Sequence, residues 1–234
     1  MKLLAIDSSG LVATVAVIEE EQMLAEYTVN FKKTHSQTLV PMLNEITQMI
    51  ELDLSSIDAI AVAKGPGSFT GLRIGSATAK GLGLALEKPI VAVPTVDALS
   101  YNVWGTDMLV CPLMDARRGQ VYTGIYAFED GKHHIIKEQC AIAVEELCEE
   151  LNIRGRKTLF LGDGVPVYRE TLAALLTVPY EFAPAHMARQ RAGALGILAM
   201  DYLKAGKTET AAEHKPDYLR LSQAERERAQ KQGT

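Results

Sequence analysis

Apolar and polar positions follow a regular order along the first hundred residues. Five runs are apolar and rich in β-branched residues, which predicts strands, and the last two are typical of strands buried on both faces. These runs are residues 3–7, 12–18, 22–29, 59–63 and 89–94. Between them, residues 36–50 have apolar side chains at helical spacing, and residues 71–86 are predicted to be a second helix. After the last strand, Thr95 is expected to cap a short helix.

The same order begins again after Tyr101. Strands are predicted at 108–115, 121–128, 133–139 and 158–162, and helices at 144–151 and 167–176. Two copies of a βββαβα unit predict an α/β protein with the ASKHA (actin/hexokinase-like) fold, because a repeat accounts for many elements at once. In this fold, two ribonuclease-H-like halves enclose a cleft.

The repeat also predicts how the chain is divided. We expect a first lobe at residues 1–104 and a second lobe at residues 105–221. A later helix, at about 191–204, is expected to pack back on the first lobe. Residues 222–234 are predicted to be a polar tail that frays.

Composition narrows the class of protein. The 234 residues are 47% hydrophobic and 23% charged with a net charge of −5, which is typical of a globular protein that does not attract nucleic acid as a whole. The three cysteines lack metal-type or redox-type spacing, which suits reduced thiols in the cytoplasm. No apolar run approaches the ~20 residues of a membrane helix, and the four apolar residues after Lys2 are too few for a signal peptide.

The sequence GPGSFTGLRIG at residues 65–75 joins a glycine-rich bend to the start of a helix. Ser68 or Thr70 is placed to accept hydrogen bonds from the first free N–H groups of a helix that begins near Leu72. A strand, a glycine-rich turn and a helix N-terminus in this order are typical of an anion site. However, the segment has neither the Gly-Lys-Ser/Thr of a P-loop nor the G-x-S-x-G of a serine hydrolase.

Two strand ends contain candidate anion ligands. They are Asp7, Ser8 and Ser9 in the first half, and Asp115 with Arg117 and Arg118 in the second. A phosphate-binding hairpin usually has glycine two residues after the aspartate, where this chain has Ser9. Either arginine is able to hold an anion. The alternative is that Asp7 and Asp115 cap turns, and no cofactor is predicted.

Histidine spacing argues against a metal site. A metal-binding helix often carries two histidines one turn apart, and His35 is followed at that distance by Leu39. A lone histidine near a helix start is typically a hydrogen-bonding or surface residue. We therefore expect no metal.

Small residues recur along one stripe of the helix at 71–86. They are Gly71, Gly75, Ala79 and Gly83. Each glycine inside a helix costs about 1 kcal/mol relative to alanine, so the stripe indicates a close backbone contact. The contact is either with the helix at 36–50 of the same chain or with a partner protein. Methionines 42 and 49 on that helix suit an adaptable interface as well as a core, so both alternatives remain open.

Longer motifs occur together in one order: AIDSS, HSQTLVPML, GPGSFTGLRIG with AKGL after it, MDARRGQVY, GDG and PDYLR. Through these motifs, which span essentially the whole chain, the sequence resembles the bacterial TsaB (YeaZ) family. The resemblance implies a cytoplasmic protein needed to make threonylcarbamoyladenosine in tRNAs that read ANN codons. In that family, the paralogue TsaD carries the metal and catalyses the transfer, and TsaB is its non-catalytic partner. Leu39, one turn after His35, supports TsaB rather than TsaD.

The resemblance also implies partners. It predicts a heterodimer with TsaD, a nucleotide-dependent complex that includes the ATPase TsaE, a homodimer when TsaD is absent, and tRNA binding only through the complex. The helices at 36–50 and 71–86 are expected to form the dimer surface. Its expected residues are Leu39, Met42, Leu43, Ile46, Leu72, Gly75, Ser76, Ala79 and Gly83. On this hypothesis, Ala79→Arg leaves the fold intact and abolishes pairing.

Two other classes of function remain open from the sequence. One is a metal-dependent, glycoprotease-like peptidase, and the other is an ATPase or kinase of the ASKHA type. A small basic cluster, Arg154, Arg156 and Lys157, is expected to be a solvated surface rather than an RNA site.

Overall fold

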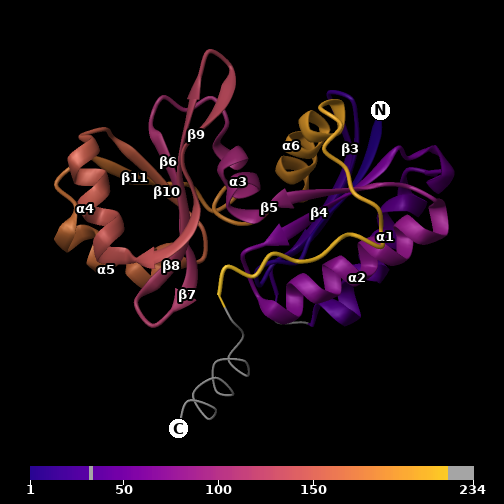
Figure 1. The fold of residues 1–234 in the computed structure, drawn as a ribbon, viewed down its shortest axis with the longest axis horizontal. Helices are drawn as coiled ribbons and strands as arrows, with labels where there is room; N and C mark the ends of the chain where they lie inside the picture. Colours follow the sequence, from indigo (N-terminus) through magenta and orange to yellow (C-terminus); the bar gives the residue numbers. More distant parts are fainter. Residues whose placement is uncertain (32–33, 221–234) are drawn as a thin grey trace, which may run out of the picture.

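The computed structural model describes residues 1–31 and 34–220. Two α/β lobes lie side by side, and each contains one twisted sheet with helices packed on it (Figure 1). The predicted polar tail at 222–234 lies outside the described residues.

The first lobe is built on a five-stranded sheet. Its strands are β1 (Lys2–Asp7), β2 (Ala13–Glu19), β3 (Gln22–Val29), β4 (Ala59–Gly65) and β5 (Ile90–Pro94). They lie in the order β3-β2-β1-β4-β5, with β1 antiparallel to β2 and parallel to β4. The helices between them are α1 (His35–Met49), the short 3-10 turn η1 (Leu54–Ser56) and α2 (Phe69–Leu86). Every strand and helix predicted between residues 3 and 94 is present.

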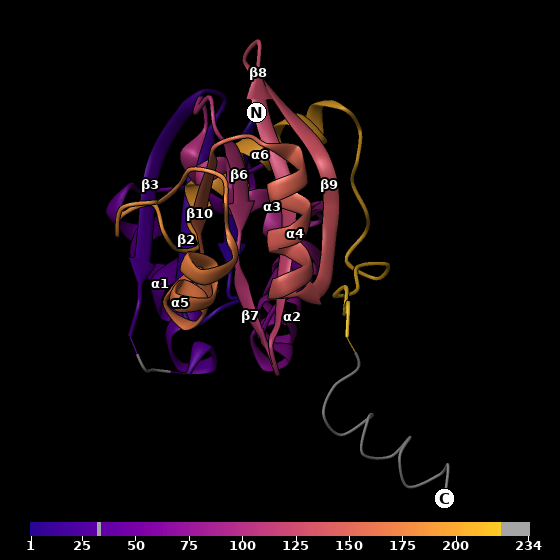
Figure 2. The ribbon, with the colours of Figure 1, turned by 90° about the vertical axis from the view of Figure 1, so that its left-hand side faces the viewer.

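The second lobe repeats this arrangement. Its strands are β6 (Leu109–Pro112), β7 (Met114–Arg117), β8 (Gln120–Glu129), β9 (Lys132–Ala143), β10 (Thr158–Leu161) and β11 (Tyr180–Phe182). Strand β8 pairs with β9 on one side and with β6 and β7 on the other. Strand β6 also pairs with β10, and β10 pairs with the edge strand β11. Helices α4 (Val144–Arg154) and α5 (Gly164–Leu175) lie together on the outer side of this lobe (Figure 2).

The strand predicted at 108–115 is divided in two. Pro112 has no N–H to donate to a neighbouring strand, and β6 pairs with β8 only at Val110 and Tyr126. The chain resumes pairing with β8 in β7, where Met114 lies opposite Tyr122. The three-residue edge strand β11 was not predicted, since so short a run has no clear period.

Alternation along the strands decides which helices cover each face of the first sheet. Leu4 and Ile6 of β1 belong to the core formed with α1 and α2. Leu3 and Ala5, which point the other way, pack against α6 (Ala192–Lys204). Helix α6 therefore completes the first lobe although it follows the second lobe in the sequence.

The short helix α3 (Thr95–Ser100) joins the lobes. Its Val96 and Leu99 are buried against the second sheet, and its Ala98 is buried in the core of the first lobe. The Tyr126 hydroxyl donates a 2.7 Å hydrogen bond to Asp97 Oδ1, which links β8 to α3. Because α3 has partners in both sheets, it fixes one lobe relative to the other.

Two helix starts differ in their caps. Ser68 caps α2, as predicted, and its side chain accepts a hydrogen bond from the Gly71 N–H. The helix begins at Phe69, three residues before the predicted start. Thr95 was expected to cap α3, and this prediction is wrong, because Pro94 occupies the N-cap position and Thr95 is already helical. The Thr95 hydroxyl instead accepts a hydrogen bond from Gly65 N, at the end of the neighbouring strand.

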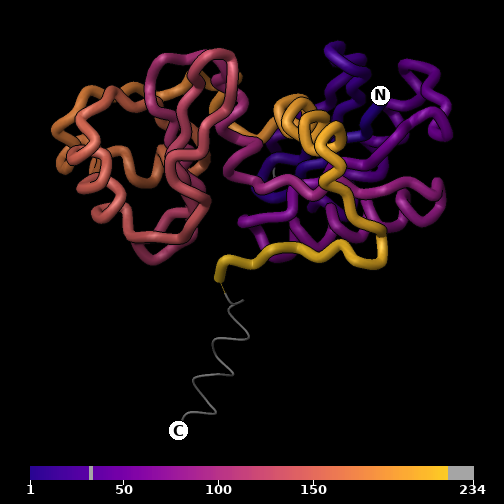
Figure 3. The backbone as a smooth tube through the Cα atoms, turned by 45° about the horizontal axis from the view of Figure 1, so that its top comes forward, coloured from indigo at the N-terminus to yellow at the C-terminus, as the bar shows by residue number. Residues whose placement is uncertain are grey.

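The last described segment returns from α6 across the first lobe to the second (Figure 3). His214 is buried, and its carbonyl accepts a hydrogen bond from Lys80 of α2. Farther along, the Asp217 N–H donates a hydrogen bond to the carbonyl of Lys64, near the end of β4. The Tyr218 ring packs against that of Phe69 in a tilted arrangement, with ring centroids 4.6 Å apart. This segment therefore ends beside the gap between the lobes.

Candidate functional site

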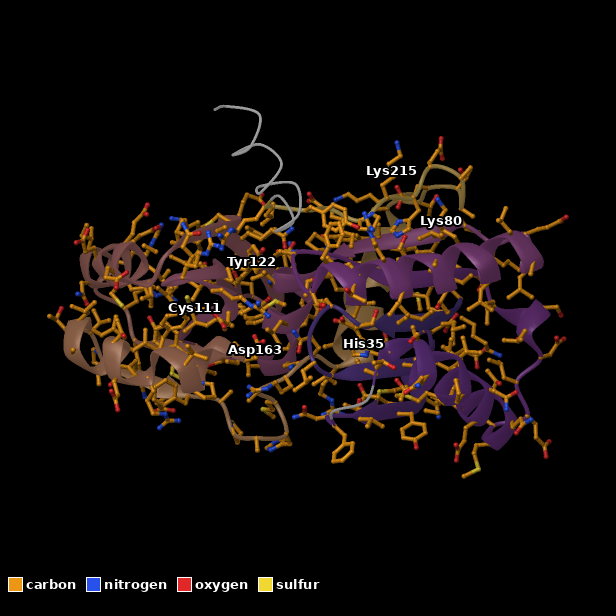
Figure 4. All side chains as sticks on the ribbon, turned by 90° about the horizontal axis from the view of Figure 1, so that it is seen from below. His35, Lys80, Cys111, Tyr122, Asp163 and Lys215 are labelled. Carbon is orange, nitrogen blue, oxygen red and sulfur yellow. The ribbon has the colours of Figure 1, made fainter. Side chains whose placement is uncertain are left out.

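A cleft of about 760 Å³ lies between the two lobes. The first lobe contributes residues 9–11, His35 and the glycine-rich segment 66–70, and the second contributes residues 114–118, Tyr122 and Asp163. Residues 217–220 form part of its wall. Figure 4 labels His35 on the first lobe and Asp163 on the second.

The two predicted aspartate hairpins occupy equivalent positions in the two lobes. Asp7 Oδ1 accepts a 2.8 Å hydrogen bond from the Ser9 N–H, and Asp115 Oδ1 accepts one of 2.8 Å from the Arg117 N–H. Each carboxylate thus holds the backbone two residues ahead, as in an Asx turn. This geometry matches the turn-capping alternative left open by the sequence.

The glycine-rich segment closes over the first hairpin. The Ser68 N–H donates a 2.7 Å hydrogen bond to the carbonyl of Ser9. In return, the Ser8 hydroxyl donates one of 2.9 Å to the carbonyl of Gly71. Hydrogen-bonding groups of the first hairpin and of the α2 start are therefore paired with each other.

Only residues without a side chain allow this approach. A Cβ at Gly67 would lie 2.3 Å from the Ser9 carbonyl oxygen, and one at Gly71 would lie 2.1 Å from the Ser8 carbonyl oxygen. One turn later, a Cβ at Gly75 would lie 2.5 Å from the Ser8 hydroxyl. Gly71 and Gly75 of the small-residue stripe thus contact the hairpin of the same chain, which is neither of the two partners expected from the sequence.

His35 connects α1 to the same hairpin. Its Nε2 forms a 2.8 Å hydrogen bond with the carbonyl of Gly10, so the ring is held beside the cleft by its own lobe. Leu39, one turn later, is buried in the core and contributes no ligand atom. Among residues 1–31 and 34–220, no three His, Cys, Asp or Glu side chains gather where they could hold a metal ion.

Asp163 lines the cleft although it was not among the candidate residues predicted from the sequence. Its Oδ1 accepts a hydrogen bond from the Asp115 N–H, and burial raises the pKa of its carboxyl. Gly162, with φ of 111°, and Gly164 bring it against the carbonyl of Leu113. The GDG motif after a buried strand was the signal that could have located it.

Two arginines of the second lobe lie at the edge of the cleft. Arg117 and Arg118, at the tip of the β7–β8 hairpin, are both exposed and have positive φ angles of 63° and 58°. Arg220 donates a hydrogen bond from Nη1 to the carbonyl of Ala116, at the base of this hairpin. The cleft therefore has carboxylates along its floor and guanidinium groups at its edge.

The nine residues expected to form the dimer surface lie inside the first lobe. All are buried, and Leu39 and Ala79 have no exposed surface at all. Leu39, Met42, Leu43, Ile46 and Ala79 belong to the core that α1 and α2 form with the first sheet, and Gly75 lies against Ser8. The expectation that Ala79→Arg would leave the fold intact is wrong, because the substitution would place a charged guanidinium in a packed core.

Comparisons with known proteins agree with this architecture. A family model described as "TsaD: tRNA N6-adenosine threonylcarbamoyltransferase" matches residues 22–228. The tRNA threonylcarbamoyladenosine biosynthesis protein TsaB of Bacillus subtilis is 34% identical, over 96% of each chain. Its Escherichia coli counterpart is 30% identical over 70% of this chain and 72% of its own. The crystal structure of YeaZ from Pseudomonas aeruginosa has a TM-score of 0.77 and 27% identity, covering 93% of this chain and 99% of its own.

Two ribonuclease-H-like sheets of the same strand order, joined around a cleft, define a protein of the ASKHA fold class. Within that class, the chain belongs to the TsaB (YeaZ) family. No helix in the described part of the chain is long and apolar enough to cross a membrane.

The contact between the hairpin and α2 predicts opposite effects for two substitutions on one helix. Gly71→Ala should lower the free energy of unfolding by about 2 kcal/mol, because the added methyl group meets the Ser8 carbonyl. Gly81→Ala should raise it by about 1 kcal/mol, since Gly81 has open space around it and alanine favours the helix. Urea unfolding of both variants measures the difference. Equal effects at the two positions would contradict the close approach.

The buried Asp7 predicts a pH dependence. Burial raises the pKa of its carboxyl to about 6 from 3.8, although hydrogen bonds from Ser9 act to lower it. The folded chain therefore binds more protons than the unfolded chain between about pH 4 and 6, so stability falls as the pH rises through this window. The shift of about two units corresponds to about 3 kcal/mol. Asp7→Asn should remove this loss.

The measurement is the free energy of unfolding of the wild type and Asp7→Asn between pH 4 and 7. The neutral amide keeps an oxygen to accept the Ser9 N–H, so the variant should gain stability relative to the wild type as the pH rises. Asp97, whose pKa burial also raises to about 6, is present in both proteins and cancels in the difference. A difference that stays constant across the range would show that Asp7 does not titrate there.

Proposed function

We propose that this chain is a non-catalytic subunit of the complex that transfers a threonylcarbamoyl group to the adenosine next to the anticodon of ANN-decoding tRNAs. Its proposed role is to activate TsaD by dimerising with it. The observation that carries this proposal is the 34% identity, over 96% of both chains, to a protein named for threonylcarbamoyladenosine biosynthesis. The match to the TsaD family model supports a shared ancestry with the catalytic paralogue.

The first hairpin supports a non-catalytic role. The Ser9 carbonyl accepts the Ser68 N–H, and Gly67 and Gly71 lie against the hairpin backbone, so these hairpin groups are engaged by the chain itself. The Ser68 hydroxyl is engaged in capping α2 rather than paired with a base. No observation favours the peptidase or kinase alternatives over the activator role.

The outer face of the two-helix layer is the proposed docking surface for TsaD. Helices α1 and α2 cover the same side of the first sheet, and the buried residues of both face inward. On the outer side of α2, Ala77, Gly81 and Leu84 are exposed at helical spacing, and α1 exposes Val40. Small residues there allow a partner helix to approach closely, and exposed Leu84 and Val40 offer apolar area.

The remaining partner assignments belong to the same proposal. TsaE joins the TsaD complex in a nucleotide-dependent manner, and tRNA is bound by the assembled complex. In the absence of TsaD, two copies of this chain pair through the same α1–α2 surface, as is usual for a self-complementary patch in a twofold dimer. The proposed location is the cytoplasm.

The function is tested by reconstitution with TsaD, TsaE and TsaC, the protein that supplies threonylcarbamoyl-adenylate in this family. We expect threonylcarbamoyladenosine to form on an ANN-decoding tRNA transcript only when this chain is added, because TsaD requires its partner. Mass spectrometry of the digested tRNA detects the product. A TsaD variant without its metal-binding histidines serves as the control and should give no product. Equal product with and without this chain would refute the proposal.

The docking surface is tested by Gly81→Arg. We expect pairing with TsaD to be lost, because a long side chain replaces open space on the outer face of α2, and we expect stability to rise by up to about 1 kcal/mol, because arginine is a better helix former than glycine. Gly81→Ala is the matched control and should keep pairing. Size-exclusion chromatography and urea unfolding give both readouts. Wild-type pairing by the stable arginine variant would exclude this face.

A further inference from the structure

The tip of the β7–β8 hairpin has side chains that its backbone does not favour. Arg117 pairs with Gln120, which leaves Arg118 and Gly119 as a two-residue loop, and both have positive φ angles, of 58° and 73°. This pattern is that of a type I′ turn, in which Asn-Gly is strongly preferred. Arg117 also has a positive φ, of 63°, which glycine adopts at lower cost. Turn formation alone therefore does not account for two arginines.

Packing does not account for them either. Within residues 1–31 and 34–220, seven arginines contact a carboxylate, a carbonyl, a hydroxyl or an aromatic ring. These are Arg73, Arg154, Arg156, Arg169, Arg189, Arg191 and Arg220. In the same part of the chain, the guanidinium groups of Arg117 and Arg118 have no hydrogen-bond or ion-pair partner, and both residues are exposed.

The surroundings of the hairpin tip add positive charge to its base. The Arg220 guanidinium is held there by the carbonyls of Ala116 and Arg117. The nearby carboxylates are engaged in the floor of the cleft, where Asp115 accepts from the Arg117 N–H and Asp163 accepts from the Asp115 N–H. Arg117, Arg118 and Arg220 all line the cleft, and arginine binds phosphate groups through paired hydrogen bonds.

We infer that Arg117 and Arg118 contact the phosphate backbone of the tRNA substrate directly. This inference rests on the proposed function, which brings tRNA to the complex, and it adds a contact made by this chain itself. With a net charge of −5 the chain as a whole repels RNA, so such a contact has to be local. Tyr122, which is half-buried, and Tyr218, whose ring already packs on Phe69, line the same cleft.

The test uses Arg117→Gly/Arg118→Asn, which replaces both arginines by the residues that the turn prefers. The hairpin should form at least as well, so the melting temperature should stay equal or rise. Binding of a fluorescent ANN-decoding tRNA transcript to the complete complex is measured by anisotropy at several salt concentrations. Affinity should fall, and the slope of log K against log salt should become shallower by about two, one for each lost phosphate contact.

Two control variants separate charge from structure. Arg117→Lys/Arg118→Lys keeps both positive charges and should retain most of the salt slope. Arg154→Ala/Arg156→Ala removes two arginines elsewhere on the second lobe, which are paired with Glu150 and Glu129, and should leave the slope unchanged. An equal loss of slope in this second variant would show a general charge effect and overturn the inference.

The remaining outcomes each identify a different error. If the wild-type complex modifies tRNA but Arg117→Gly/Arg118→Asn keeps wild-type affinity and salt slope, the inference is wrong and the proposed function stands. If the variant loses TsaD pairing on size-exclusion chromatography, the arginines bind an acidic protein surface instead.

If inorganic phosphate or ADP raises the melting temperature of the wild type but not of the variant, and tRNA affinity is unchanged, the site binds free phosphate groups rather than tRNA. If the wild-type complex gives no modified tRNA, the proposed function itself fails.

Discussion

The mutual hydrogen bonding of the first hairpin and the α2 start is the constraint on which the first lobe depends. The Ser68 N–H donates a hydrogen bond to the Ser9 carbonyl, and the Ser8 hydroxyl donates one to the Gly71 carbonyl. Backbones can approach this closely only where side chains are missing, so the glycines at 67, 71 and 75 follow from it. The same contact holds the start of α2 against the first hairpin, and the outer face of α2 is the proposed docking surface.

The two halves of the cleft share one architecture but differ in the side chains at their hairpins. Both hairpins are held by an aspartate that accepts the N–H two residues ahead. The first is covered by α2 and carries small hydroxyl side chains, whereas the second projects exposed arginines at its tip. Helix α3 and the Asp97–Tyr126 hydrogen bond hold the lobes together, so the rim of the second lobe stands in a fixed position relative to the α1–α2 surface.

Several features could be predicted from the sequence because they depend on local or periodic signals. The repeated order of strands and helices, the Ser68 cap and the family motifs were all readable in this way. The inward orientation of Leu39 and Ala79 was not, because an apolar stripe looks the same whether it faces the chain's own sheet or a partner. Asp163 was missed for a related reason, since its neighbours in the cleft are distant along the chain.

The sequence by itself determined the secondary structure, the twofold repeat and the family, since hydrophobic period and motif order are properties of the chain alone. Only the tertiary structure decided which surfaces are free. It assigned Gly71 and Gly75 to the Ser8–Ser9 hairpin, placed α6 on the first lobe and left two arginines without partners in the described part of the chain. The physical reason is that burial and pairing depend on what lies opposite a side chain, and that neighbour comes from a distant part of the sequence.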